Sequence, residues 1–73
     1  MTLRSREFSE FWGKKVLVKV TRGRDTYVGQ LIREEISFIF LVNVLIPERK
    51  QKIPRLAISK KAIREVHELP GDV

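Results

Sequence analysis

The sequence predicts a mainly β protein, in which a short N-terminal helix precedes a five-stranded, strongly bent antiparallel barrel. Three observations support this fold class. Apolar residues alternate with period two from residue 14 onward, turn residues interrupt the alternation at short intervals, and a glycine lies inside one predicted strand. With 73 residues the chain is expected to form a single domain, comprising the helix (residues 1–12), the barrel (14–69) and a tail (70–73).

The expected helix covers Leu3 to Trp12. Leu3, Phe8 and Trp12 recur near helical spacing, and Gly13 follows as a plausible end. A helix of this length is not stable by itself, so we expect it to pack against the barrel.

Two alternating segments, residues 14–21 and 25–35, predict a β-hairpin. Arg22 and Gly23 supply the turn between them. Gly29 lies inside the second strand, where a glycine usually marks a bend or a close approach of another backbone. A strongly bent strand is also what a small barrel needs in order to close.

The next segment, residues 36–46, is apolar at both alternating positions, so we expect both of its faces to be covered. One face would meet the core, and the other would meet the helix or a second subunit. Residues 47–54 are polar and bracketed by prolines, which predicts a loop. Short strands at residues 55–59 and 63–69, joined by a turn at 60–62, complete the barrel.

The chain is basic and lacks cysteine. It has 15 Lys and Arg, 9 Asp and Glu, and a formal net charge of +6, a balance that favours a polyanion such as nucleic acid. A small domain without disulfides needs another source of stability, and oligomerisation is the one that remains. The basic segment is expected to contact phosphates, with a solvated loop as the alternative, and its cations are Arg49, Lys50, Lys52 and Arg55.

Several function classes are not indicated. His67 has carboxylates nearby. The sequence shows no partner nucleophile, no Gly-rich phosphate loop and no metal-ligand spacing, so we expect no enzyme, cofactor or metal. The first ten residues lack the apolar core of a signal peptide, and residues 36–46 are too short to cross a membrane. We therefore expect a cytoplasmic protein that does not act at a membrane.

The spacing of several motifs resembles the Sm/LSm family, the RNA-associated ring proteins that include bacterial Hfq and archaeal Sm-like proteins. The matching features are "VLVKV", Gly23, Gly29-Gln30-Leu31, Glu35, "FIFLVNV" and the closing "AISKKAIREV". The resemblance covers residues 3–69. It implies an SH3-like, Sm-type barrel whose edge strands pair with neighbouring subunits in a homo-oligomeric ring of six to eight copies, with seven favoured.

The resemblance also implies a pocket for single-stranded RNA. Its positions in this chain are Glu35, Ser37, Phe38, Ile39, Ser59, Lys60 and Lys61. The chain departs from the family at several of them, since Ser37 replaces a stacking side chain, Ile39 an Asn that reads uracil, Ser59-Lys60 an Arg-Gly pair and Glu35 an Asp. We therefore expect RNA contact mainly through phosphates, including those held by Lys60 and Lys61, with weak or altered uridine specificity.

Two other functions fit the same residues. The chain could be a structural or protein-interaction subunit of an Sm-like ring whose RNA pocket has decayed. It could also be a monomeric SH3-like basic module associated with the ribosome or with DNA.

Overall fold

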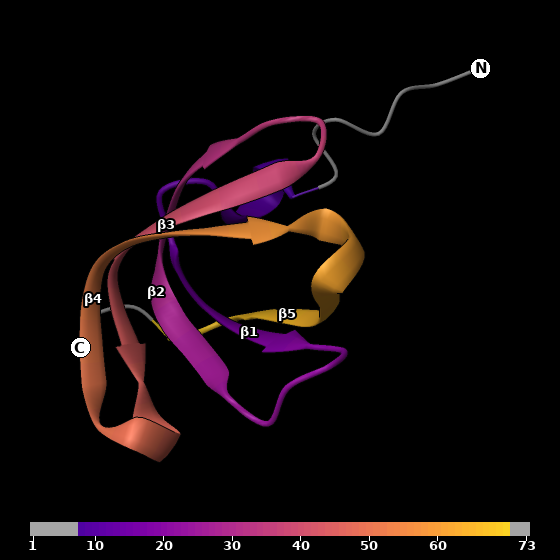
Figure 1. Ribbon diagram of the computed structural model, residues 1–73. Coiled ribbons are helices and arrows are strands. Elements are labelled where there is room, and N and C mark those ends of the chain that lie inside the picture. Colours follow the sequence, from indigo (N-terminus) through magenta and orange to yellow (C-terminus); the bar gives the residue numbers. More distant parts are fainter. Residues whose placement is uncertain (1–7, 71–73) are drawn as a thin grey trace.

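The computed structural model describes residues 8–70, and in this part five antiparallel strands form one curved sheet (Figure 1). Their order across the sheet is β4-β3-β2-β1-β5, so β4 and β5 are its two edges. The prediction of a mainly β fold with five antiparallel strands is confirmed. The elements are η1 (Ser9–Phe11), β1 (Lys15–Val20), β2 (Thr26–Glu34), β3 (Phe38–Ile46), η2 (Pro47–Arg49), β4 (Gln51–Ser59), η3 (Lys60–Ala62) and β5 (Ile63–Glu68).

The sheet is strongly bent but open, so the prediction of a closed barrel is wrong. Within the described residues β4 pairs only with β3, and β5 pairs only with β1. The connection between the two edge strands is η3, a three-residue turn that leads from one edge to the other without folding them into a hairpin (Figure 1). Both edges consequently present backbone groups that could pair with another chain.

The predicted N-terminal helix is also absent from the part of the chain that the structure describes. Residues 3–7 of that prediction lie outside the described residues, and Ser9–Phe11 forms a single 3-10 turn. Trp12 already has extended backbone, with ψ of 131°, and Gly13 has a φ of +79°. The chain therefore leaves the turn at Gly13 and enters β1 directly, as expected where a helical segment is too short to be stable.

The predicted hairpin of β1 and β2 is confirmed, and Gly29 allows β3 to approach it closely. The two strands pair from Lys15 opposite Gln30 to Lys19 opposite Thr26. A Cβ atom on Gly29 would lie 3.0 Å from the carbonyl oxygen of Val42 and 3.1 Å from a methyl group of Val44, both on β3. The glycine is therefore needed for close packing of these strands.

A bulge at Asn43 changes which residues of β3 face the core. Before the bulge Ile39 and Leu41 are buried, and after it Val44 and Ile46 are buried. Asn43 has a φ of 53°, and β3 gains one residue relative to β2 at this point. The core-facing residues of β3 therefore shift by one position halfway along the strand. On its other face Phe38 and Leu45 are exposed, so cover of that face by a second subunit stays a prediction.

β4 is longer than predicted and begins at Gln51 instead of residue 55. Pro54 lies inside it, at the position that faces the bulge of β3 in the register between the two strands. Proline is tolerated there because β4 is an edge strand. The predicted loop of residues 47–54 thus shortens to η2 and Lys50, which has a left-handed φ of 50°.

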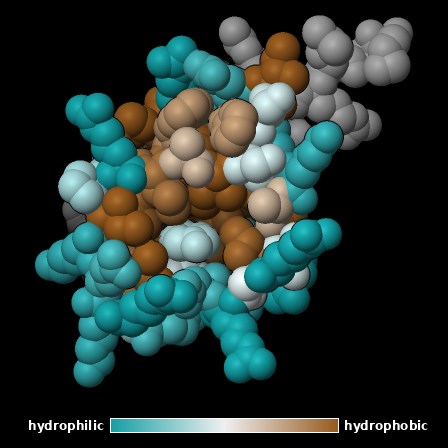
Figure 2. Space-filling view, in the orientation of Figure 1, coloured by the Kyte–Doolittle hydropathy of each residue, from teal (hydrophilic) through white to brown (hydrophobic). Residues whose placement is uncertain are grey.

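The core lies inside the bend of the sheet. Its most buried residues are Val16, Val18, Leu31, Ile39, Leu41, Val44 and Ile58. Figure 2 shows apolar side chains gathered in the middle of one face and surrounded by hydrophilic side chains. A hollow of about 600 Å³ between β4 and the turn after β1 is lined partly by Val20, Leu56 and Ile58, so the core is not fully covered along this edge.

Candidate nucleic-acid interface

The two segments that resemble the family's RNA motifs lie together at the end of the sheet where β2 turns into β3. We call this the pocket end and define it by Glu35, Ser37, Phe38 and residues 59–61. The backbone N–H of Lys60 donates to the carbonyl oxygen of Ser37 at 2.8 Å, and Phe38 pairs with Ser59 across the β3–β4 ladder. The structure therefore brings these predicted positions together, although they come from different parts of the sequence.

The side chains at the pocket end offer little for reading a base. Ile39 is completely buried in the core and cannot contact a ligand. The hydroxyl of Ser59 accepts the backbone N–H of Lys61 at 3.3 Å, and Glu35 forms an ion pair with Arg33. Phe38, with 42% of its surface exposed, is the aromatic side chain available here.

Lys60 is held by a buried carboxylate that the sequence analysis did not single out. The Glu34 side chain is fully buried, that of Lys60 is 10% exposed, and the ammonium lies 2.6 Å from a carboxylate oxygen. The same carboxylate accepts the backbone N–H of Phe8 at 3.2 Å and the indole N–H of Trp12 at 3.1 Å. The positive charge of Lys60 is thus balanced inside the protein, and a phosphate would have to compete with Glu34 for it.

The inward position of Glu34 follows from a second irregularity in the sheet. Leu31 points into the core, and regular alternation would then place Arg33 inward and Glu34 outward. The pairing of β2 with β3 gains one residue on β2 between Leu31 and Arg33, at Ile32. After this bulge the side chain of Glu34 points inward and that of Arg33 points outward. No signal in the sequence marks the bulge.

The basic segment of residues 49–55 begins at the opposite end of the sheet. The nine-residue strands β3 and β4 run between its hairpin and the pocket end, a length of about 25 Å measured along the strand. The two groups of predicted RNA-binding residues therefore cannot form one small site. Arg55 lies between them on β4, where it is exposed and pairs with Val42.

The hairpin of β3 and β4 is fastened to the turn between β1 and β2. Arg49 forms an ion pair with Asp25 at 2.8 Å. Glu48 accepts the backbone N–H of Thr26 at 2.9 Å and its hydroxyl at 2.8 Å, and these hydrogen bonds lower the pKa of the Glu48 carboxyl. Two loops that are far apart in sequence therefore form one surface, at the bottom of Figure 1.

This surface, which we call the hairpin end, carries cations that have no acid partner. Within the described residues Arg22, Arg24, Lys50 and Lys52 are exposed and take part in no ion pair. Lys50 and Lys52 belong to the predicted basic loop, whereas Arg49 of that loop is engaged by Asp25. In the sequence Arg22 indicates a turn, and the cluster Arg-Gly-Arg is the signal by which both arginines could also be predicted as phosphate contacts.

Comparisons with known proteins add no family to this description. A scan against protein-family models and a search of the curated proteins each found no match to the chain. None of the helices in residues 8–70 is long and apolar enough to cross a membrane. In the same residues no group of three or more potential metal ligands from His, Cys, Asp and Glu is present.

Proposed function

We propose that this chain is an Sm-like RNA-binding protein that forms a homo-oligomeric ring in the cytoplasm and contacts single-stranded RNA mainly through its phosphates. The hairpin end carries the proposal, because Arg22, Arg24, Lys50 and Lys52 lie without acid partners among the described residues in two loops that contacts of Asp25 and Glu48 hold together. Phosphate groups are the ligands that such a surface favours. Repetition around a ring would multiply the field of each subunit.

The two open edges of the sheet support the ring. The edge strand β4 of one subunit could pair with β5 of the next, and a closed ring would then leave no edge exposed. The hollow beside β4 would receive apolar side chains of the neighbour. Six to eight subunits, with seven favoured, remain the number that the family resemblance implies.

Weak or altered uridine specificity is part of the proposal. Ile39 is buried where the family has a base-reading Asn, and Ser37 offers no ring for stacking. Lys61 is exposed and free to hold a phosphate, whereas Lys60 is engaged by Glu34. RNA contact at the pocket end would therefore be weaker than at the hairpin end.

A structural ring subunit with a decayed RNA pocket is the second candidate. The ion pair of Glu34 and Lys60 favours it, because this pair turns a position of the family's RNA pocket into part of the core. It predicts the same ring but no salt-dependent RNA binding. A monomeric SH3-like module on the ribosome or DNA would form no ring at all.

Native mass spectrometry of the nuclease-treated protein in ammonium acetate tests the assembly. We expect a single species of six to eight subunits. A monomer or dimer at micromolar concentration would overturn the ring and leave the monomeric module.

Fluorescence anisotropy with labelled single-stranded RNA tests the binding. We expect the logarithm of the association constant to fall linearly with the logarithm of salt concentration, with a slope of about −0.7 for each phosphate contacted. The expected difference between oligouridine and oligoadenosine is less than about tenfold. A ring that binds neither RNA at 50 mM salt would instead support the structural subunit.

A further inference from the structure

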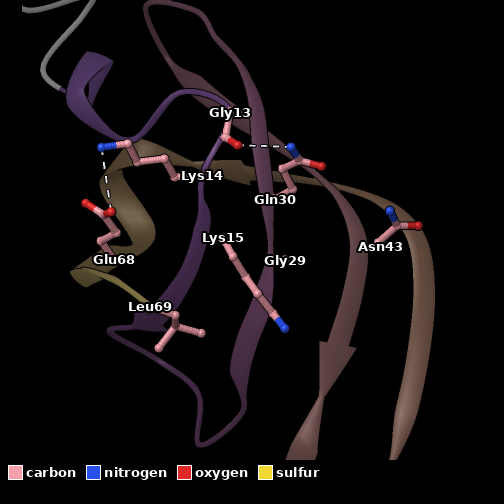
Figure 3. A pocket seen from close by; sticks show the side chains of 8 residues that line it. All are labelled: Gly13, Lys14, Lys15, Gly29, Gln30, Asn43, Glu68 and Leu69. Atoms are coloured by element: carbon pink, nitrogen blue, oxygen red, sulfur yellow. Dashed lines mark hydrogen bonds and ion pairs between the residues drawn. The ribbon is translucent and has the colours of Figure 1, made fainter. Parts of the chain in front are cut away.

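A polar hollow lies on the outer face of the sheet, away from both ends described above (Figure 3). Its volume is about 500 Å³, within the range of sites that hold small ligands. Three of its polar lining residues, Lys15, Gln30 and Asn43, come from the neighbouring strands β1, β2 and β3 (Figure 3). Lys15 and Gln30 are cross-strand partners next to the buried pair of Val16 and Gly29, so their side chains point away from the core.

The charges of the hollow leave one positive charge unbalanced. Lys14 forms an ion pair with Glu68 at 3.6 Å on one side of it. Lys15 takes part in no ion pair within residues 8–70, and its side chain extends beside Gly29 (Figure 3). A ligand with one anionic group therefore matches the hollow better than a neutral or cationic ligand.

Two carboxamides, from Gln30 and Asn43, also line the hollow. The Nε2 group of Gln30 donates to the carbonyl oxygen of Gly13 at 3.0 Å, which orients the amide and leaves its oxygen as an acceptor. Asn43 makes no hydrogen bond to any described residue through its side chain, and the bulge fixes its backbone at a φ of 53°. Amides can both donate and accept, and they are among the groups that recognise the edge of a nucleobase.

The hollow continues toward the hairpin end. A second hollow, of about 440 Å³, shares Asn43 with the first and is also lined by Leu45, Lys52 and Pro54. Lys52 is one of the unpaired cations of the hairpin end. A single strand whose phosphates lie on those cations would therefore reach the first hollow along a continuous surface of the same subunit.

We propose that the outer hollow binds one nucleotide of single-stranded RNA, with a phosphate at Lys15 and the base edge at Asn43 and Gln30. This inference rests on the proposed function in that the hairpin end holds the neighbouring phosphates. It adds a base contact that the pocket end does not supply.

The first test is an NMR titration of the isotope-labelled full chain with adenosine 5′-monophosphate, uridine 5′-monophosphate and ribose 5-phosphate. The side-chain NH₂ resonances of Asn43 and Gln30 are the readout. We expect saturable shifts with a nucleotide at millimolar concentration, and smaller shifts at Asn43 with ribose 5-phosphate. No shift at 10 mM nucleotide overturns the site, and equal shifts with ribose 5-phosphate overturn the base contact.

The second test compares two substitutions in the RNA anisotropy assay. Asn43→Gly removes the amide but tolerates a positive φ, and Lys15→Met keeps the length of the side chain without its charge. We expect each to weaken RNA binding about three- to tenfold, and Lys15→Met also to reduce the salt slope by about 0.7. Ser9→Ala, which removes an exposed polar side chain outside the hollow and outside the hairpin end, is the control and should leave binding unchanged.

The outcomes separate this inference from the proposed function. If Lys50→Ala/Lys52→Ala weakens RNA binding while Asn43→Gly and Lys15→Met do not, the outer hollow is overturned and the proposed function stands. If the wild-type chain binds no RNA, the proposed function fails, and the mononucleotide titration still decides whether the hollow is a nucleotide site.

Discussion

At the pocket end of the sheet a carboxylate holds Lys60, and the neighbouring Arg33 is also paired, whereas at the hairpin end several cations have no acid partner among the described residues. Glu34 engages Lys60 and Glu35 engages Arg33. At the hairpin end Asp25 and Glu48 hold the two loops together and leave Lys50 and Lys52 exposed. The difference shows that a cation in a predicted RNA-binding segment is not always available to a ligand. Charge at the pocket end contributes mainly to the fold, and charge at the hairpin end is available to a partner.

The largest effect is expected at Glu34. Glu34→Ala should lower the free energy of unfolding by about 3 kcal/mol or more, because three donors lose the buried carboxylate that they share. Urea unfolding at a fixed protein concentration measures the change. The RNA affinity of the folded protein should stay within about twofold of wild type, since Glu34 is buried.

The control for Glu34 is the double variant Glu34→Leu/Lys60→Met, which replaces both charges by apolar side chains. It should recover the part of the lost stability that comes from the unpaired Lys60 ammonium, since an apolar pair of similar volume is often neutral or stabilising, whereas the N–H groups of Phe8 and Trp12 still lose this acceptor. If Glu34→Ala unfolds like wild type but binds RNA tenfold more tightly, Lys60 is a phosphate ligand restrained by Glu34, and the contrast between the two ends fails.

The next largest effect is expected in RNA binding at the hairpin end. Lys50→Ala/Lys52→Ala should weaken binding of single-stranded RNA about tenfold or more at 100 mM salt and reduce the salt slope by about 1.4. Its stability should remain within about 0.5 kcal/mol of wild type, because both side chains are exposed.

The matched control compares Arg33→Ala, which removes one cation that is paired with a carboxylate away from the hairpin end, with Lys50→Ala alone, which removes the same charge. We expect the RNA affinity of Arg33→Ala to fall less than threefold. Equal losses in the two single variants would mean that net charge and not its location governs binding, and the hairpin end would not be a specific RNA-binding surface.

A smaller effect distinguishes the two lysines of the pocket end. Lys61→Ala should weaken RNA binding about two- to fivefold without changing stability, because this lysine is exposed and in no ion pair with a described residue. Lys60→Ala should destabilise the protein instead, since its ammonium contacts Glu34. Anisotropy and urea unfolding of both variants check this, and the reverse pattern would contradict the assignment of Lys60 to the core.

The sequence predicts local features of this fold well. The hairpin of β1 and β2 follows from alternation and from the turn at Arg22 and Gly23, and the close approach at Gly29 follows from a glycine inside a strand. Each of these features is determined by residues that are close together in the sequence. They depend little on where the rest of the chain lies.

Features that depend on distant residues were not predictable in the same way. The bulges at Asn43 and Ile32 change which side chains face the core, and they arise from the register between whole strands. The open sheet depends on η3 joining its two edges, and the pairing of Lys60 with Glu34 depends on the Ile32 bulge. The sequence shows which loops contain cations, but only the folded structure shows which of these cations form ion pairs with carboxylates.

The smallest effect concerns the carboxylate that fastens the two loops of the hairpin end. The hydrogen bonds from Thr26 lower the pKa of Glu48 below its ordinary value of 4.5. A lowered pKa in the folded protein means that this contribution is complete above pH 4.5 and is lost as the pH falls through the lower, folded-state value. We therefore expect the backbone N–H of Thr26 to exchange faster with solvent only at acidic pH, after correction for the intrinsic pH dependence of exchange.

Hydrogen exchange at Thr26, measured by NMR between pH 6 and pH 3, tests this expectation locally. A local readout is needed because the hydrogen bond from His67 also lowers the pKa of Glu65, which would add to any global change in stability over the same range. Glu48→Gln keeps an acceptor but cannot titrate, so its Thr26 protection should be weaker than wild type at pH 6 and independent of pH. If the protection of Thr26 in the wild type is also independent of pH, Glu48 does not hold the two loops together. The contact between the loops must then come from Arg49 and Asp25.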